Sequence, residues 1–445
     1  MSEKIIRKTA SVCPVCLKRV VAYQVENTQD HRVWQIKKCE EHGNFRNLIW
    51  AGRMPIADWR GNYPTIKVDD APLCPTNCGL CSDHLQKTCC VILEVTNRCN
   101  LKCKFCFAQG GDKAEAEPTF EELKKQIHNL VDGGRTLIQI SGGEPTMRED
   151  LPELIAEAKK AGCKYVQLNS NGIRIANEKG YIKKLKDAGL SFVFMQFDGV
   201  TDDVYRTLRG RNLFLTKCRA IANCAKENIG VTLVPTVTPG VNDKQLGDIL
   251  RFAVKHSPAV RGIHLQPAGY LGRIPDIPEE DARYPLDRLL FDLVEQSDGM
   301  LKLENLAPSC CDHPLCSFHG DFMVLPKGKL MPLGKKYTGK TQNCCCCGSE
   351  DDAKSAEKNR EFVGKRWLRG DEKPEEDKDD CCCDDKAMDM DYFVKRVKTH
   401  GFTITSMTFQ DAGTFDLERL RRCSLHIYKD GKFIPFCANY LTPWN

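Results

Sequence analysis

The spacing of its cysteines constrains this chain more than any other feature of the sequence. The chain has 26 cysteines among 445 residues, and most of them stand within five residues of another cysteine. Disulfide-dense proteins are typically short and secreted, whereas this chain is long and its start, MSEKIIRKTASVC, has no apolar signal-peptide core. Short spacings instead gather thiolates around one metal ion or cluster. We therefore expect metal ligation in a reducing cytoplasm, because exposed thiolates and clusters oxidise.

From residue 90 onward, short apolar runs alternate with helical patterns. The strand-like runs are residues 90–96, 137–141, 164–169, 191–197, 231–237 and 261–266. The helical patterns cover residues 119–132, 149–161, 178–188, 212–228 and 243–256. This alternation favours an α/β fold with a parallel sheet. Six units fit a partial (β/α)6 barrel better than a closed barrel of eight strands.

The same patterns divide the chain into four parts. Residues 1–70 form a small metal unit like a rubredoxin or zinc ribbon, residues 71–90 are a Cys-rich segment, and residues 91–283 form the barrel. Residues 284–445 make a C-terminal Cys-rich region, in which we expect residues 335–387 to be a charged, exposed and partly disordered insertion. No apolar run is long enough for a transmembrane segment.

Three cysteines directly follow the first predicted barrel strand: Cys99, Cys103 and Cys106. Thiolates at this spacing can reach three corners of a cubane cluster, whereas a cluster that only stores electrons normally has four cysteine ligands. No fourth cysteine follows Cys106 at a ferredoxin-like spacing, so one iron is left open, as in catalytic metal sites. An open iron can be chelated by the amino and carboxylate groups of a methionine moiety. Loops at this end of barrel strands carry the chemistry.

Polar or glycine-rich segments end the later strands. Gly142-Gly143-Glu144-Pro145 follows the second strand, and its two glycines allow the backbone to approach a ligand closely. The other candidate ligand-binding residues at strand ends are Asn169, Ser170, Asn171, Gln196, Asp198 and Gln266.

The CxxxCxFC and GGEP motifs resemble those of the radical S-adenosylmethionine (SAM) superfamily. The resemblance implies a [4Fe–4S] cluster on Cys99, Cys103 and Cys106 that reductively cleaves SAM to a 5′-deoxyadenosyl radical. It also implies that the GGEP edge holds the SAM amino group and that the strand-end residues contact SAM or substrate. The fold it implies is the partial radical SAM barrel.

Further cysteine groups predict additional metal sites. The first group, suited to one zinc or iron ion, is Cys13, Cys16, Cys39 and His42. A second group, with Cys90 as an alternative to its last member, is Cys74, Cys78, Cys81 and Cys89. A third, with Cys310 as an alternative to its first member, is Cys311, Cys316, Cys423 and Cys437. The last two groups predict two auxiliary [4Fe–4S] clusters. The role of Cys344–Cys347 and Cys381–Cys383 is open.

The order of these motifs is similar to that in a branch containing the archaeal tetraether lipid synthases and the class D, pterin-methylating radical SAM enzymes. This resemblance implies C–C bond formation or methylation at an unactivated carbon of a lipid or pterin-like small molecule. The implied electron donor is a ferredoxin or flavodoxin, and a lipid substrate would place the enzyme at a membrane surface. The insertion at 335–387 departs from the pattern of the lipid synthases.

Two other functions are considered. A non-catalytic iron–sulfur electron carrier would need no open iron, so the three-cysteine motif speaks against it. A radical SAM enzyme that modifies RNA would use the N-terminal unit as a nucleic-acid module. The net charge of +5 gives no basic stripe to support this, and we expect no nucleic-acid partner.

Overall fold

The computed structural model describes residues 3–444 with several gaps. The residues left out within that span are 62, 64–73, 76–77, 112–116, 278, 280–282, 310, 335–336, 338–351 and 371–389. The open questions about Cys310, Cys344–Cys347 and Cys381–Cys383 therefore lie outside the described residues. Among the described helices, none combines the length and the apolar character that a membrane crossing requires.

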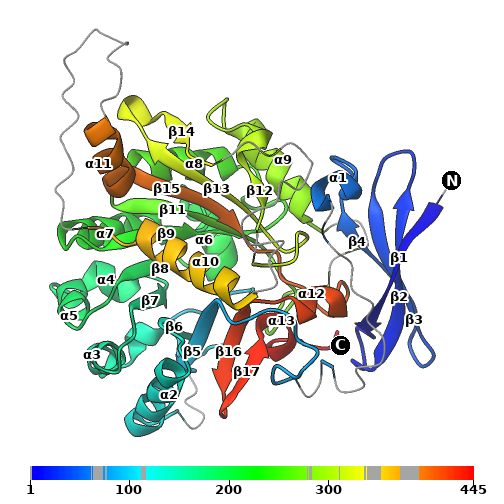
Figure 1. Cartoon of the computed structure of the whole chain (residues 1–445), viewed down its shortest axis with the longest axis horizontal. Coiled ribbons are helices and arrows are strands. Elements are labelled where there is room, and N and C mark those ends of the chain that lie inside the picture. Colours follow the sequence, from blue (N-terminus) through cyan, green and yellow to red (C-terminus); the bar gives the residue numbers. More distant parts are fainter. Residues whose placement is uncertain are drawn as a thin grey trace.

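The N-terminal unit is a four-stranded antiparallel sheet at one side of the molecule (Figure 1). Its strands are β1 (Glu3–Val12), β2 (Arg19–Asn27), β3 (Val33–Cys39) and β4 (Gly43–Trp50). Helix α1 (Ile56–Arg60) follows. Buried polar bonds attach the sheet to the C-terminal part of the chain: Thr9 Oγ1 donates to Asp416 at 2.8 Å, and Gln35 Nε2 donates to the carbonyl of Phe415 at 2.8 Å.

The centre of the molecule is a curved parallel sheet, and all six predicted strands are present in it. They are β5 (Cys90–Thr96), β6 (Leu137–Gly142), β7 (Tyr165–Ser170), β8 (Phe192–Gln196), β9 (Gly230–Val234) and β11 (Val260–Pro267). Neighbouring strands pair in parallel in this order. The predicted run 231–237 is divided, because a short strand β10 (Thr236–Val237) pairs with β11 rather than continuing β9.

Helices between the strands cover the outside of this sheet (Figure 1). They are α2 (Phe120–Asp132), α3 (Leu151–Lys160), α4 (Ile173–Asn177), α5 (Tyr181–Asp187), α6 (Asp202–Arg209), α7 (Phe214–Lys226), α8 (Leu246–Lys255) and α9 (Leu286–Gln296). A capping box starts α2: Thr119 caps the helix, and Glu122 bonds back to it. Helices α4 and α6 were not predicted, because both are short and stand close to longer neighbours.

Strands from the C-terminal region extend both edges of the barrel sheet. Beyond β11 come β15 (Gly401–Ser406), β13 (Phe318–Val324), β12 (Ala307–Pro308) and β14 (Leu330–Pro332). Beyond β5 come β16 (Leu425–Lys429) and β17 (Lys432–Pro435), which form an antiparallel hairpin. The remaining C-terminal helices are α11 (Met390–His400), α12 (Leu417–Arg421) and α13 (Phe436–Asn439). The C-terminal region is thus continuous with the barrel sheet.

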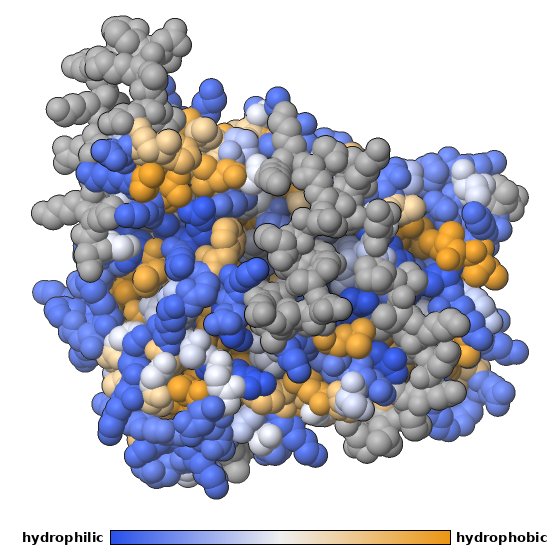
Figure 2. All heavy atoms as spheres, in the orientation of Figure 1, coloured by the Kyte–Doolittle hydropathy of each residue, from blue (hydrophilic) through white to orange (hydrophobic). Residues whose placement is uncertain are grey.

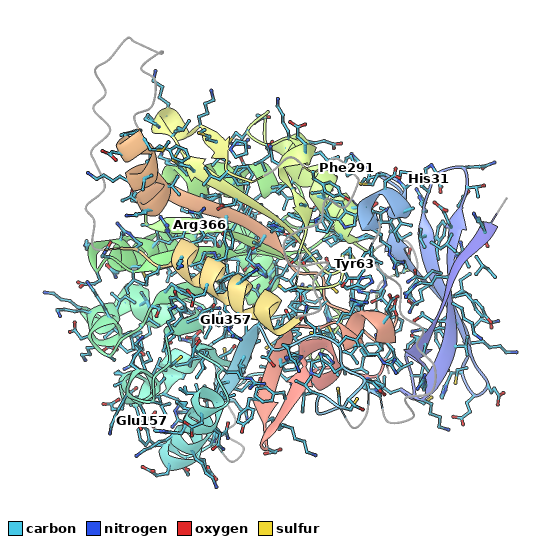
Figure 3. All side chains as sticks on the ribbon, in the orientation of Figure 1. His31, Tyr63, Glu157, Phe291, Glu357 and Arg366 are labelled. Atoms are coloured by element: carbon cyan, nitrogen blue, oxygen red, sulfur yellow. The ribbon has the colours of Figure 1, made fainter. Side chains whose placement is uncertain are left out.

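Helix α10 (Asp352–Trp367) belongs to the charged insertion and packs against the sheet. Trp367 is only 6 % exposed and lies in a hydrophobic cluster with Tyr165 and Phe192, which begin β7 and β8. The expectation of an exposed insertion is therefore wrong for this helix. The few apolar residues of α10 stand among many charged ones. The average composition of the segment therefore gives no sign that one face of the helix is buried. Figure 3 shows Glu357 and Arg366 on α10, which crosses the strands of the sheet. On the same face of the molecule, Figure 2 shows a surface that is mainly hydrophilic.

Candidate active site

The loop after β5 carries Cys99, Cys103 and Cys106, and all three line a cavity of about 670 Å³. Backbone bonds between Cys106 and Arg273 hold the end of the loop, with both N···O distances at 3.0 Å. The guanidinium of Arg273 also donates to the carbonyls of Cys103 and Gly110, each at 3.0 Å. The segment that follows β11 therefore holds the cysteine loop in place through Arg273.

The chemistry of the three thiols fits an iron–sulfur cluster. Burial raises the pKa of the Cys99 thiol to about 12, and the negative charges of Glu144, Cys103 and Cys106 add to the effect. Thiolates crowded in this way are stabilised by positive charge, which the irons of a cluster provide. The three residues therefore suit a cluster with three protein sulfurs. Binding of the cluster at this site stays a prediction.

The end of β6 is clamped to the cysteine loop by two glycines. Gly142 has a φ of +118°, and a Cβ there would lie 2.3 Å from the carbonyl oxygen of Thr96. A Cβ on Gly143 would lie 2.3 Å from the carbonyl oxygen of Arg98. Backbone N–H groups of Gly143 and Glu144 donate to those same carbonyls at 2.7 and 2.8 Å. Only glycine permits this approach.

Glu144 connects the ends of β6 and β7. It is 1 % exposed, and its carboxylate accepts bonds from the Ser170 hydroxyl at 2.7 Å and from the Asn171 N–H at 2.7 Å. The Thr146 hydroxyl also donates to it at 2.6 Å, next to Pro145, which opens a short 3-10 turn. Glu144 therefore fixes the position of the motif through its carboxylate and its own N–H, which donates to the Arg98 carbonyl.

Most of the predicted strand-end residues line the same cavity. These are Gly142, Gly143, Glu144, Asn169, Ser170, Asn171, Gln196 and Gln266. Asp198 lies behind this wall, fully buried, and accepts from Arg209 Nε at 2.7 Å and from Arg209 Nη2 at 2.6 Å. Arg209 itself lines the cavity and interacts with Cys103. Asp198 is thus placed to orient Arg209, and its direct contact with SAM stays a prediction.

Sequence reasoning missed Arg209 and Lys217. Arg209 ends α6, and a signal for that helix existed: Thr201 and the aspartates at its start, and Gly210 with a φ of +75° at its end. Lys217 is fully buried on α7, and its Nζ donates to Gln196 Oε1 at 2.8 Å. Burial lowers the pKa of Lys217 to about 8. Nothing in the sequence distinguishes this lysine from an exposed one.

The structure groups the cysteines of the two predicted auxiliary clusters differently from the prediction. Cys74 lies with Cys78, and the charge of Cys81 also acts on it. Cys89 instead contacts Cys311, and both line the main cavity.

The other three members of the second predicted auxiliary set come close to one another. Burial raises the pKa of the Cys423 thiol, and the charges of Cys437 and Cys316 act in the same direction. In each predicted set, three of the four cysteines therefore lie close together. The fourth members, Cys89 and Cys311, contact each other instead. That either set binds a cluster stays a prediction.

The N-terminal group has the geometry of a metal site. The ligand atoms of Cys13, Cys16, Cys39 and His42 all lie within 4.8 Å of one another. The sulfurs of Cys16 and Cys39 are 3.9 Å apart, and His42 Nδ1 lies 3.7 Å from Cys13 Sγ and 3.5 Å from Cys39 Sγ. A tetrahedral zinc site with standard bond lengths gives about 3.8 Å between sulfurs and about 3.5 Å between sulfur and nitrogen. The four residues fit zinc or iron.

We expect His42→Ala to lose its metal and His31→Ala to keep it. Removing one of four ligands opens the tetrahedral site, whereas the half-buried His31, in the turn between β2 and β3, contacts Glu26 and no member of the group. The measurement is metal content by atomic emission after dialysis of the full chain against a chelator. If the His42 variant retains as much zinc and iron as the His31 variant, the four residues do not form the site.

Profiles of two protein families match the chain. The Radical SAM superfamily matches residues 93–253, which include the barrel from β5 to α8. The HMPTM N-terminal zinc ribbon domain matches residues 5–51, which include the four-residue metal group.

Individual relatives extend this similarity. The 7,8-dihydro-6-hydroxymethylpterin dimethyltransferase of Methanocaldococcus jannaschii is 33 % identical over 97 % of this chain and 93 % of its own length. The Fe-coproporphyrin III synthase of Methanosarcina barkeri is 38 % identical over 46 % of this chain and 50 % of its own. The crystal structure of Streptococcus suis SuiB bound to precursor peptide SuiA covers 48 % of each chain at 17 % identity, with a TM-score of 0.39. Because the first of these matches runs through the ribbon, the barrel and the C-terminal strands alike, the chain belongs to the class D group of the radical SAM superfamily.

Proposed function

We propose that this radical SAM enzyme methylates an unactivated carbon of a pterin-like heterocycle. The observation that carries the proposal is a single cavity of about 670 Å³ that reaches from the cysteine loop to α10. Its volume lies within the range of about 300–1,000 Å³ that is usual for small-molecule sites. The near full-length relative is named for pterin dimethylation, which agrees in substrate class.

The walls of the cavity combine apolar surface with polar side chains, as a small heterocycle requires. A lipid with long chains needs an extended apolar tunnel, whereas Val363 and Trp367 of α10 line the cavity at the strand starts. Amide and imidazole side chains face the cavity from β6, β7, β8 and β11, and a heterocycle can hydrogen-bond to them, which a hydrocarbon cannot.

Each part of the chain has a distinct role in this proposal. When bound, a [4Fe–4S] cluster with one open iron supplies the electron that splits the sulfonium of SAM. Cys99, Cys103 and Cys106 hold the cluster, and the glycines of the GGEP motif let the backbone approach the SAM amino group. Aromatic side chains around the loop, among them Phe107 and Tyr440, exclude water from the reacting groups.

The remaining cysteines support an electron supply. We propose two auxiliary [4Fe–4S] clusters, one at Cys74, Cys78 and Cys81 and one at Cys316, Cys423 and Cys437, each completed by a further ligand. Cys89 and Cys311, which contact each other, are the proposed further ligands. The proposed reductant is a ferredoxin or flavodoxin, and the proposed compartment is the cytoplasm, because exposed clusters and thiolates oxidise.

The test is an anaerobic incubation of the reconstituted chain with SAM and 7,8-dihydro-6-hydroxymethylpterin. An extract that lacks this protein and keeps its small molecules supplies the reductant and the one-carbon donor for the methyl group. We expect 5′-deoxyadenosine and a pterin that has gained methyl groups, both measured by mass spectrometry. Formation of 5′-deoxyadenosine with an unchanged pterin, and a change in the lipid fraction instead, would overturn the proposed substrate.

A further inference from the structure

The inward side chains of the barrel form two layers. Side chains on one face of a strand recur at every second residue, and inward residues of a barrel stack in layers. The layer at the strand ends holds three of the predicted SAM contacts: Asn169, Gln196 and Gln266. The side chains two positions earlier on the same strands are Gln167, Phe194 and His264. At a rise of about 3.3 Å per residue, this second layer lies roughly 6–7 Å deeper.

His264 presents one free nitrogen to the second layer. Its Nδ1 lies 2.8 Å from Thr405 Oγ1, and that hydroxyl donates to the carbonyl of Ile263 at 3.4 Å. The hydroxyl therefore accepts the Nδ1 proton, which leaves Nε2 as an acceptor. Burial lowers the pKa of His264 to about 3, so the ring is neutral at neutral pH. The ring lies against Phe194 with centroids 5.0 Å apart.

The amide of Gln139 lies on β6, which β7, β8 and β9 separate from the β11 strand of His264. Gln139 lies on β6, two positions before Ser141, and lines the cavity. Its Oε1 accepts from Asn169 Nδ2 at 3.5 Å, whereas its Nε2 donates to no partner among the described residues. Gln167 Nε2 donates to Asn169 Oδ1 at 2.7 Å and so fixes that amide from behind. A donor on Gln139 and an acceptor on His264 thus face the same space.

Helix α10 forms an aromatic floor below this layer. The indole N–H of Trp367 donates to Thr403 Oγ1 at 2.9 Å, and its ring lies 5.3 Å from Phe194 and 5.6 Å from Phe192. The end of the helix is held by Arg261, whose Nε donates to the carbonyl of Arg366 at 2.7 Å. Arg366, labelled in Figure 3, also pairs with Asp321 at 2.6 Å. The floor is therefore rigid and limits the depth of the cavity.

We infer that Gln139, Phe194 and His264, above the floor at Trp367, form the binding site for a flat heterocycle that carries hydrogen-bond donors and acceptors. This inference rests on the proposed function and names the residues that would recognise its substrate. Phe194 and Trp367 provide flat apolar contacts, while Gln139 Nε2 donates to a ring carbonyl or nitrogen and His264 Nε2 accepts from a ring N–H. A pterin carries both kinds of group at the periphery of its ring system.

The layer also explains why the site would reject a saturated chain. Sites built to hydrogen-bond a ligand discriminate strongly against analogues that lack the matching groups, since their buried polar atoms are then left unpaired. The insertion that carries α10 therefore sets both the depth of the site and, through Trp367, its aromatic character.

The test is equilibrium dialysis of 7,8-dihydro-6-hydroxymethylpterin with the anaerobically reconstituted full chain, without SAM and without turnover. We expect Gln139→Leu and His264→Phe each to weaken binding about tenfold or more, since each removes one bond to the ring edge. Gln29→Leu, on an exposed turn of the N-terminal sheet, is the matched control and should bind as the unchanged chain does. Iron content and the thermal unfolding midpoint establish that each variant is folded.

The outcomes separate this site from the proposed reaction. Folded Gln139 and His264 variants that bind the pterin as tightly as the unchanged chain, or an unchanged chain that does not bind it, would overturn the site. Binding with the expected loss but no methylation in the extract would leave the site standing and overturn the proposed function. Methylation of the pterin with an unaltered KM in both variants would support the proposed function and overturn the site.

Discussion

Cys103→Ser is expected to reduce 5′-deoxyadenosine formation to the background rate. Serine oxygen is a poor ligand for cluster iron, so a site that already has only three protein sulfurs is left with two. The three thiols line one cavity and their charges act on one another, so none can be replaced by a neighbour in the loop. We expect the iron content to fall by roughly four atoms per chain, the number in one cubane.

Cys218→Ser is the matched control for this loss. Cys218 lies on α7 and was assigned to no metal site, so its variant should retain both the iron and the nucleoside product. The measurements are iron by colorimetric assay and 5′-deoxyadenosine by chromatography after anaerobic incubation with SAM and dithionite. Product from the Cys103 variant at the rate of the control would mean that the cluster is held elsewhere.

Asp198→Asn is expected to destabilise the fold by about 3–5 kcal/mol, because it leaves a buried charge without its partner. Asp198 is fully buried, Arg209 is 5 % exposed at its side chain, and two bonds of 2.7 and 2.6 Å join them. Burial acts to lower the pKa of Arg209, and the carboxylate of Asp198 more than offsets this, so the guanidinium stays charged. An asparagine retains the shape but not the charge.

The exposed pair between Asp248 and Arg251 gives the comparison. Its atoms lie 2.8 Å apart with both side chains at least 41 % exposed, and Asp248→Asn should change stability by less than about 1 kcal/mol. Urea unfolding followed by circular dichroism measures both variants. Equal midpoints for the two would show that the buried pair does not stabilise the barrel.

Local patterns were sufficient to predict the barrel. The run CVILEVT coincides with β5, and the helical spacing in 119–132 matches α2 within one residue. Both signals come from side chains close together in the sequence, where hydrophobic period decides the element. The cysteine loop was equally local, because three ligands within eight residues define it.

Features that depend on distant segments could not be predicted. The contact between Cys89 and Cys311 joins residues more than two hundred positions apart, and no spacing rule relates them. The addition of β15 and β16 to the two edges of the barrel is likewise set by the packed sheet. Helix α10 was missed because Trp367 and its apolar neighbours stand within a charged run, so their burial depends on the strand starts they cover.

The most direct measurement of the central claim is electron–nuclear double resonance of the reduced protein with SAM labelled with ¹⁵N at its amino group. If Cys99, Cys103 and Cys106 leave one iron open, the label will show a hyperfine coupling to the cluster, and this coupling will be absent from Cys103→Ser. A reduced cluster whose spectrum is unchanged by SAM, with no coupling to the label, would show that a fourth protein ligand fills that iron and would contradict the claim.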